Sequence, residues 1–275
     1  MTPPRDRLGA IAGAARPLIG MIHVGATPGS PRAARDPGAL ADAAADEARA
    51  LADAGFDAAI VENMHDRPYV MDPGPEVVAC MTRAALAARD AAPGLALGVQ
   101  ILSGDGIDAL AVAHAASASF IRVENFAFAH VADEGLMTRA RAGPLLRRRR
   151  AIGAESVAVF ADVKKKHASH ALTADLGLAD ACRAAEFFLA DGLVITGVAT
   201  GGPTDPADLA EARSASGLPI LVGSGATASS LPALLEHADG VIVGSAIKED
   251  GRWDRPVDHD RCRAMARAFR AAAAG

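Results

Sequence analysis

Short runs of β-branched and other apolar residues alternate along the chain with longer Ala-rich segments. Eight such runs occur, at residues 18–24, 58–62, 95–101, 120–124, 156–163, 192–196, 219–223 and 240–244. The segments between and after them carry apolar residues at helical spacing, at 39–54, 75–92, 107–117, 143–152, 178–189, 206–216, 227–237 and 258–273. A strand followed by a helix, repeated along the chain, predicts a parallel sheet built from βα units.

The length of the chain favours one closed arrangement of these units. Spread over 275 residues, the units average roughly 34 residues each, which is typical of a (β/α)8 TIM barrel. A doubly wound open sheet is the alternative, although no GxGxxG follows the first strand. No Pro- or Ser-rich linker divides the chain, so we expect an N-terminal extension at 1–16 and a single α/β barrel domain at 17–275.

Composition excludes several classes of function. The net charge of −5 gives no reason to expect a nucleic-acid partner, and one Trp and one Tyr supply few stacking groups. Cys80, Cys182 and Cys262 are widely spaced, which indicates reduced packing residues in place of a disulfide framework. No signal peptide and no apolar run of about 18 residues is evident. We therefore expect a cytoplasmic protein without an integral membrane segment.

The clearest local signal is a pair of Gly-Ser turns after the last two predicted strands. VGSGAT contains Gly223, Ser224 and Gly225, and VGSAIK contains Gly244 and Ser245. Small residues let backbone N–H groups approach a phosphate, and a helix starting near Thr227 would direct its positive end at the anion. The glycines can instead serve only to permit tight turns. Lys248 fits either a phosphate contact or a solvated surface charge.

The segment DVKKKH carries the predicted fifth strand directly into three lysines and a histidine. Strand alternation would place Asp162, Lys164 and Lys166 on one side, with Lys165 facing solvent. A lysine among apolar walls has a lowered pKa and can form a Schiff base or donate a proton. We therefore expect Asp162, Lys166 and His167 among the catalytic residues, while a solvated charge run is the alternative.

Two identical Glu-Asn pairs follow predicted strands two and four. Glu62 and Glu124 at the barrel mouth can divide general acid and general base roles, share a metal, or pair with a rim cation such as Arg122. His23, at the end of the first strand, is a proton carrier, a ligand or a hydrogen-bonded core residue. Asn63 and Asn125 beside the two Glu residues, and Thr196 and Gly201 after the sixth predicted strand, are expected to bind substrate or its phosphate.

Some features of the chain leave alternatives open. His23, Glu62, Glu124, Asp162 and His167 would supply donors for a divalent metal, but no HxH or HExxH spacing supports one. Residues 126–141 are long for a βα loop and either close over a ligand or contact another subunit. Phe187 and Phe188 permit a homo-oligomer interface.

Taken with their order and spacing, several motifs resemble those of the BtpA/SgcQ family, over about residues 17–269. They are PLIGMIHVGATPGSP, VENMHDRPY, ADEGL with LLRRRRAIGA, DVKKKHA, GLVITGVATGGPTDP, PILVGSGAT and GVIVGSAIKEDGRW. The chain departs from the family after the third strand, where Gln100 and LSGDG replace an Asn-rich turn. The resemblance implies a TIM barrel similar to ribulose-phosphate-binding barrels, and it brings in a role in photosystem I biogenesis.

Two functions follow as hypotheses. The first is an enzyme that acts on a phosphorylated small molecule, such as a sugar phosphate or a nucleotide-like compound, by lyase, isomerase or glycosyl-bond chemistry. The second, carried mainly by the resemblance, is a non-enzymatic assembly factor for a membrane complex such as photosystem I.

Overall fold

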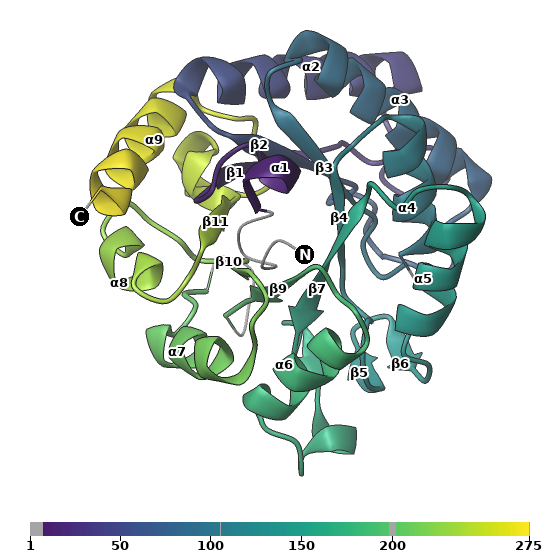
Figure 1. Cartoon of the computed structure of the whole chain (residues 1–275). Helices are drawn as coiled ribbons and strands as arrows, with labels where there is room; N and C mark the ends of the chain where they lie inside the picture. Colours follow the sequence, from purple (N-terminus) through teal and green to yellow (C-terminus); the bar gives the residue numbers. More distant parts are fainter. Residues whose placement is uncertain (1–7, 105, 198–201, 275) are drawn as a thin grey trace.

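Eight parallel strands close into a barrel in a computed structural model that describes residues 8–104, 106–197 and 202–274 (Figure 1). The order around the barrel is β1, β11, β10, β9, β7, β4, β3 and β2. Their bounds are β1 Leu18–His23, β2 Ala58–Glu62, β3 Ala96–Gln100, β4 Phe120–Val123, β7 Ala158–Val163, β9 Gly192–Ile195, β10 Ile220–Val222 and β11 Gly240–Val243. The predicted (β/α)8 TIM barrel is confirmed, and the open sheet is excluded.

Helices surround the barrel and cover its outer face (Figure 1). They are α2 Pro37–Ala54, α3 Pro75–Ala91, α4 Ile107–Ala115, α5 Ala142–Ala151, α6 Leu178–Phe187, α7 Pro206–Ala215, α8 Leu231–Leu235 and α9 His259–Ala273. Asp36, Asp205 and Asp258 cap α2, α7 and α9 through side-chain hydrogen bonds to first-turn amides. Among the described residues, no helix combines the length and the apolar character needed to cross a membrane.

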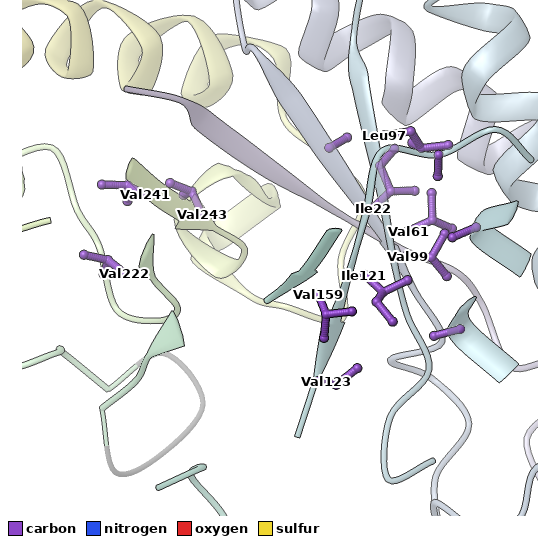
Figure 2. Packing of buried hydrophobic residues seen from close by; sticks show 14 of the residues in the cluster. Ile22, Val61, Leu97, Val99, Ile121, Val123, Val159, Val222, Val241 and Val243 are labelled. Atoms are coloured by element: carbon purple, nitrogen blue, oxygen red, sulfur yellow. The ribbon is translucent and has the colours of Figure 1, made fainter. Parts of the chain in front are cut away.

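Alternate residues of each strand face opposite sides of the barrel wall. Val61 and Val99 point outward and pack beneath the helices with other outward residues of the strands (Figure 2). Ile19, Met21 and Ile60 point inward and belong to a separate apolar cluster inside the barrel. The same alternation turns the last residues of the strands, including His23 and Glu62, into the barrel mouth.

Two phenylalanines fill the interior below the mouth. The rings of Phe120 and Phe160 meet edge to face with centroids 5.5 Å apart. A Cβ at Gly98 would lie 2.3 Å from Phe120, and one at Gly192 would lie 2.2 Å from Phe160, so both glycines make room for the rings. At the opposite end, α1 (Leu8–Ala12) adds Leu8, Ile11 and Ala12 to the inner cluster. The expected N-terminal extension thus contributes to the core of the barrel.

The long segment after β4 forms structure of its own. β5 (His130–Ala132) pairs antiparallel with β6 (Gly135–Met137) and with β8 (Ala168–Ser169), which follows β7. This small sheet connects the loops that follow β4 and β7. Short 3-10 turns follow at η2 (Ala171–Thr173), η3 (Ser245–Ile247) and η4 (Glu249–Gly251).

Candidate functional site

A cavity of about 1080 Å³ opens at the carboxyl ends of the strands. This is the end of a TIM barrel at which the loops that follow the strands gather. Many of the residues predicted from sequence line it: His23, Glu62, Glu124, Lys166, His167, Gly223, Ser224, Gly225, Gly244 and Ser245. The structure therefore brings both Glu residues, the histidines and the two Gly-Ser turns to one cavity.

His23 and Glu62 are register partners on neighbouring strands, and their side chains face each other. His23 Nε2 lies 3.5 Å from Glu62 Oε2, and His23 Nδ1 lies 2.8 Å from the carbonyl oxygen of Trp253. Because a carbonyl only accepts, Nδ1 carries the proton of the neutral ring and Nε2 is left to accept from Glu62. The loop after β11 therefore sets the tautomer of His23.

Burial changes the pKa of both members of this pair. Desolvation, assisted by the positive charge of Lys248, lowers the pKa of His23 well below its ordinary value. Desolvation also raises the pKa of Glu62 to about 7, because it outweighs the opposing positive charge of Arg122. A neutral imidazole thus faces a carboxyl group that gains and loses its proton near neutral pH, which is the range suited to general acid–base catalysis.

Glu124, in the second Glu-Asn pair, has a different environment. Its Oε2 accepts from Lys165 Nζ at 3.1 Å and from the backbone amide of Ser103 at 3.2 Å. Burial alone would raise the pKa of Glu124, but Lys165, Arg122 and the amide of Ser103 together outweigh burial and lower it. Glu124 is therefore an ionised counter-ion, in contrast to Glu62. The prediction that Lys165 faces solvent was wrong, because the residue is only 5% exposed.

The error on Lys165 has a backbone cause. β7 ends at Val163, and Lys164 adopts a left-handed conformation with φ 47°, which ends the strand alternation. Lys164 then turns outward to donate to the carbonyl of Leu176 at 2.6 Å, and both Lys165 and Lys166 line the cavity. Desolvation and the charge of Arg122 lower the pKa of Lys166. Lys166 forms no hydrogen bond or close ion pair within the described part of the chain.

Asp162 does not line the cavity but holds a residue that does. Arg122 donates to Asp162 through Nε at 2.8 Å and through Nη2 at 3.0 Å, and both side chains are buried. A Cβ at Gly223 would lie 3.3 Å from Arg122 Nη2, so the glycine leaves space for the guanidinium group. In the structure Asp162 neutralises and orients Arg122, and the catalytic role expected for Asp162 stays a prediction.

Three of the residues expected to bind substrate lie outside the cavity. Asn63 accepts from the amide of Leu102 at 2.8 Å and donates to Asp66 at 3.0 Å, so it connects two loops. Asn125 donates to the carbonyl of Arg139 at 2.9 Å. Neither asparagine lines the cavity, and neither does Thr196. Gly201 lies outside the described residues.

The two Gly-Ser turns differ in which of their hydroxyl and amide groups already make hydrogen bonds with the described residues. Ser224 Oγ accepts from the amide of Gly197 at 2.8 Å and donates to the carbonyl of Gly202 at 3.2 Å, so it fastens loops together. Ser245 Oγ makes no hydrogen bond with the described residues, and the amides of Ala226, Ser245 and Ala246 donate to none of them. The expected helix start near Thr227 was wrong, because α8 begins only at Leu231 and is 5 residues long. Its dipole therefore gives little support to an anion site.

Lys248 fits neither of its two predicted roles. It is fully buried, and its Nζ lies 2.7 Å from Glu47 Oε2 on α2. Glu47 also accepts from the amide of Val257 at 3.2 Å. This pair anchors the loop after β11, from which the carbonyl of Trp253 contacts His23.

The five donors proposed for a metal are dispersed by these pairings. Asp162 binds Arg122, Glu124 binds Lys165, and His167 Nδ1 lies 3.8 Å from Asp133 at the rim. Within the described part of the chain, no group of three or more His, Cys, Asp or Glu residues has an arrangement that fits a metal ion. The three cysteines are free and buried, as expected.

Several cavity residues were missed from sequence. The guanidinium carbon of Arg67 lies over the ring of Trp253, 4.6 Å from the ring centroid. Tyr69 donates a hydrogen bond to the carbonyl of Met64 at 2.8 Å. Gln100 and Ser103 line the wall formed by the loop after β3. Gln100 could have been predicted from the sequence, because it is the polar residue that ends an apolar strand. In the structure it lies at the same level as Glu62, its register partner.

Comparison with known proteins places this arrangement in a defined context. The model of the BtpA family matches residues 14–271. An uncharacterized mitochondrial protein of Caenorhabditis elegans is 40% identical over 252 residues, covering 90% of each chain. The photosystem I biogenesis protein BtpA of Synechocystis sp. is 37% identical over 257 residues, covering 92% of this chain and 88% of that protein.

Solved structures with the same fold are more distant in sequence. Thiamine phosphate pyrophosphorylase from Pyrococcus furiosus aligns with a TM-score of 0.58 at 13% identity, covering 93% of this chain and 96% of that one. Phosphoribosyl anthranilate isomerase from Thermus thermophilus aligns with a TM-score of 0.54 at 12% identity, covering 92% and 98%. Both likenesses concern the barrel fold, and both proteins are named for phosphorylated compounds.

Proposed function

The chain belongs to the BtpA family, and from its barrel mouth we propose that it is an enzyme that transfers protons on a small phosphorylated substrate. The observation that carries the proposal is the Glu62–His23 pair. A carboxyl group with a pKa of about 7 lies 3.5 Å from a neutral imidazole in a cavity large enough for a sugar phosphate. Such a pair can donate a proton to one substrate atom and remove one from another.

The phosphate would bind at the β10–β11 side of the cavity. Ala226, Ser245 and Ala246 line this side, and their backbone amides have no acceptor within the described residues. Ser245 adds a hydroxyl group, and Gly244 keeps the backbone open to the cavity. Fixed N–H donors in a largely buried site are the usual means of holding a phosphate in barrels of this kind.

Lys166 would be the third reacting group. Its amine has a lowered pKa and lines the same cavity as Glu62. In its charged form it would stabilise an oxyanion on the substrate, and in its neutral form it would attack a carbonyl carbon to give a Schiff base with loss of water. Proton transfer of this type serves lyase, isomerase and glycosyl-bond reactions.

The first test is ligand-induced thermal stabilisation. The intact protein is heated with phosphorylated sugars, nucleotides and inorganic phosphate, because a ligand that binds only the native state raises the melting temperature. We expect a phosphorylated compound to raise it, and we expect Ser245→Asp to abolish the shift by adding a like charge. Ser214→Asp, the same change at an exposed serine on α7 outside the cavity, is the matched control.

A second candidate function comes from the relative in Synechocystis sp. That protein is named for photosystem I biogenesis, so a non-enzymatic assembly role is the alternative for this chain. Relatives of similar identity include a nematode protein and an archaeal one from Archaeoglobus fulgidus. If no phosphorylated compound raises the melting temperature while a specific protein partner is recovered by pull-down, the assembly role replaces the enzymatic one.

A further inference from the structure

One wall of the cavity carries buried polar atoms that have no hydrogen-bond partner among the described residues. Gln100 Oε1, Ser103 Oγ and Glu134 Oε2 are inaccessible to solvent and make no hydrogen bond with the described residues. All three residues line the cavity. Gln100 is 1% exposed and Ser103 is 4% exposed. We refer to Gln100, Ser103 and Glu134 as the acceptor wall.

The surrounding structure holds this wall in place. Gln100 is the register partner of Glu62, so its side chain extends into the mouth at the level of the proton-transfer pair. The next turn is fixed from both sides, because Asn63 accepts from the amide of Leu102 and Glu124 accepts from the amide of Ser103. Ser103 also adopts a left-handed backbone conformation with φ 61°. A conformation that costs free energy is maintained at the edge of the cavity.

The charges near the wall restrict what can bind to it. Lys165 Nζ lies 3.1 Å from Glu124 and 3.9 Å from Glu134, so one ammonium group faces two carboxylates. A second phosphate or a carboxylate would meet excess negative charge there. The unpartnered atoms are two acceptor oxygens and one hydroxyl, which call for a group that donates hydrogen bonds.

We propose that the acceptor wall binds the uncharged, hydroxyl-bearing end of the substrate, opposite the phosphate. This inference rests on the proposed function and specifies its substrate class as a phosphorylated polyol or sugar with a single charged end. Each buried polar atom without a hydrogen bond destabilises the free protein, and a bound hydroxyl removes that cost. Hydroxyl-rich ligands should thus gain affinity from this wall.

Two variants test the proposal in the intact protein. Gln100→Met keeps the size of the side chain and removes its hydrogen-bonding groups, and Ser103→Ala removes only the hydroxyl. Met21→Leu, an apolar change in the same cavity, is the control. The probes are ribose 5-phosphate, which has both ends, and inorganic phosphate, which has only one. Melting temperatures are recorded with and without each probe.

We expect ribose 5-phosphate to stabilise the unaltered protein more than phosphate does, with a dissociation constant at least tenfold lower. Gln100→Met and Ser103→Ala should lose that excess, keep the response to phosphate, and melt without ligand at the same or a higher temperature. Equal responses to both probes would overturn the proposal for the acceptor wall, and so would an extra stabilisation by ribose 5-phosphate that survives in both variants. Neither result would contradict the proposed phosphate site. A ligand-free melting temperature lowered in both variants would also overturn it, because those groups would then be partnered in the free protein. Failure of phosphate and of every phosphorylated compound would instead refute the proposed function.

Discussion

Arg122 and Asp162 form a bidentate ion pair across neighbouring strands, at 2.8 and 3.0 Å, with both side chains buried. Burial opposes ionisation of Arg122, but Asp162, assisted by Glu62 and Glu124, raises the pKa of Arg122. The guanidinium group is therefore always charged. It also acts on its neighbours, since its charge lowers the pKa of Lys166 and limits the rise in the pKa of Glu62.

Removal of one partner from this pair should be costly. Asp162→Ala leaves a buried guanidinium group without its counter-ion, and we expect the free energy of unfolding to fall by about 3–5 kcal/mol. The double variant Arg122→Met, Asp162→Leu removes both charges, so it should recover a large part of the loss. Urea unfolding measures the free energy of unfolding of Asp162→Ala and of the double variant. A double variant as unstable as Asp162→Ala would show that packing, and not the unpaired charge, causes the loss.

Glu62 should make stability depend on pH in a defined direction. Its pKa is about 7 in the folded protein and near the ordinary value of 4.5 in the unfolded chain. The unfolded state therefore ionises first, and the free energy of unfolding falls as pH rises from about 4.5 to 7. Relative to Glu62→Gln, the unaltered protein should lose roughly 3 kcal/mol across this range and then level off.

This difference is measured by urea unfolding of both proteins at several pH values. His23 is present in both, so its own titration largely cancels in the comparison. A stability difference that is constant between pH 4.5 and 7 would mean that Glu62 has an ordinary pKa, and the acid–base role proposed for it would lose its support.

The fold was predictable because it depends on local patterns. Apolar alternation located all the barrel strands, and Ala58–Glu62 has the predicted bounds. The site was predictable where a strand carries a side chain directly into the mouth, as for His23 and Glu62, and where a Gly-Ser turn follows a strand. Lys165 was misplaced because the left-handed turn at Lys164 reverses the alternation. The pairing of Lys248 with Glu47 spans 201 positions, and no local pattern reports such a contact.

Gly225 should be intolerant of any side chain, for structural reasons. Its φ is 69°, and a Cβ would lie 2.1 Å from the carbonyl oxygen of Gly202. Gly225→Ala should thus lower the free energy of unfolding by about 2 kcal/mol or more. Gly244→Ala should change it by much less, because its Cβ meets only ordinary contacts. Similar losses in the two variants would show that the β9–β10 loop contact does not constrain Gly225.

Lys166 should be the most reactive lysine of the chain. The others are occupied, since Lys164 donates to Leu176, Lys165 to Glu124 and Lys248 to Glu47. The lowered pKa of Lys166 leaves more of its amine neutral at pH 7, and the neutral amine is the nucleophile. Limited acylation with a small uncharged reagent, followed by peptide mass spectrometry, should therefore find Lys166 modified first.

The same experiment tests the electrostatic coupling within the site. The negative charge of ionised Glu62 raises the pKa of Lys166. In Glu62→Gln this charge is absent, so acylation of Lys166 at pH 8, where Glu62 is mostly ionised, should become faster by about a factor of two or more. Earlier modification of Lys165 than of Lys166 would contradict the assignment. Because acylation requires only a neutral amine, this result would stand whether or not a substrate has been identified.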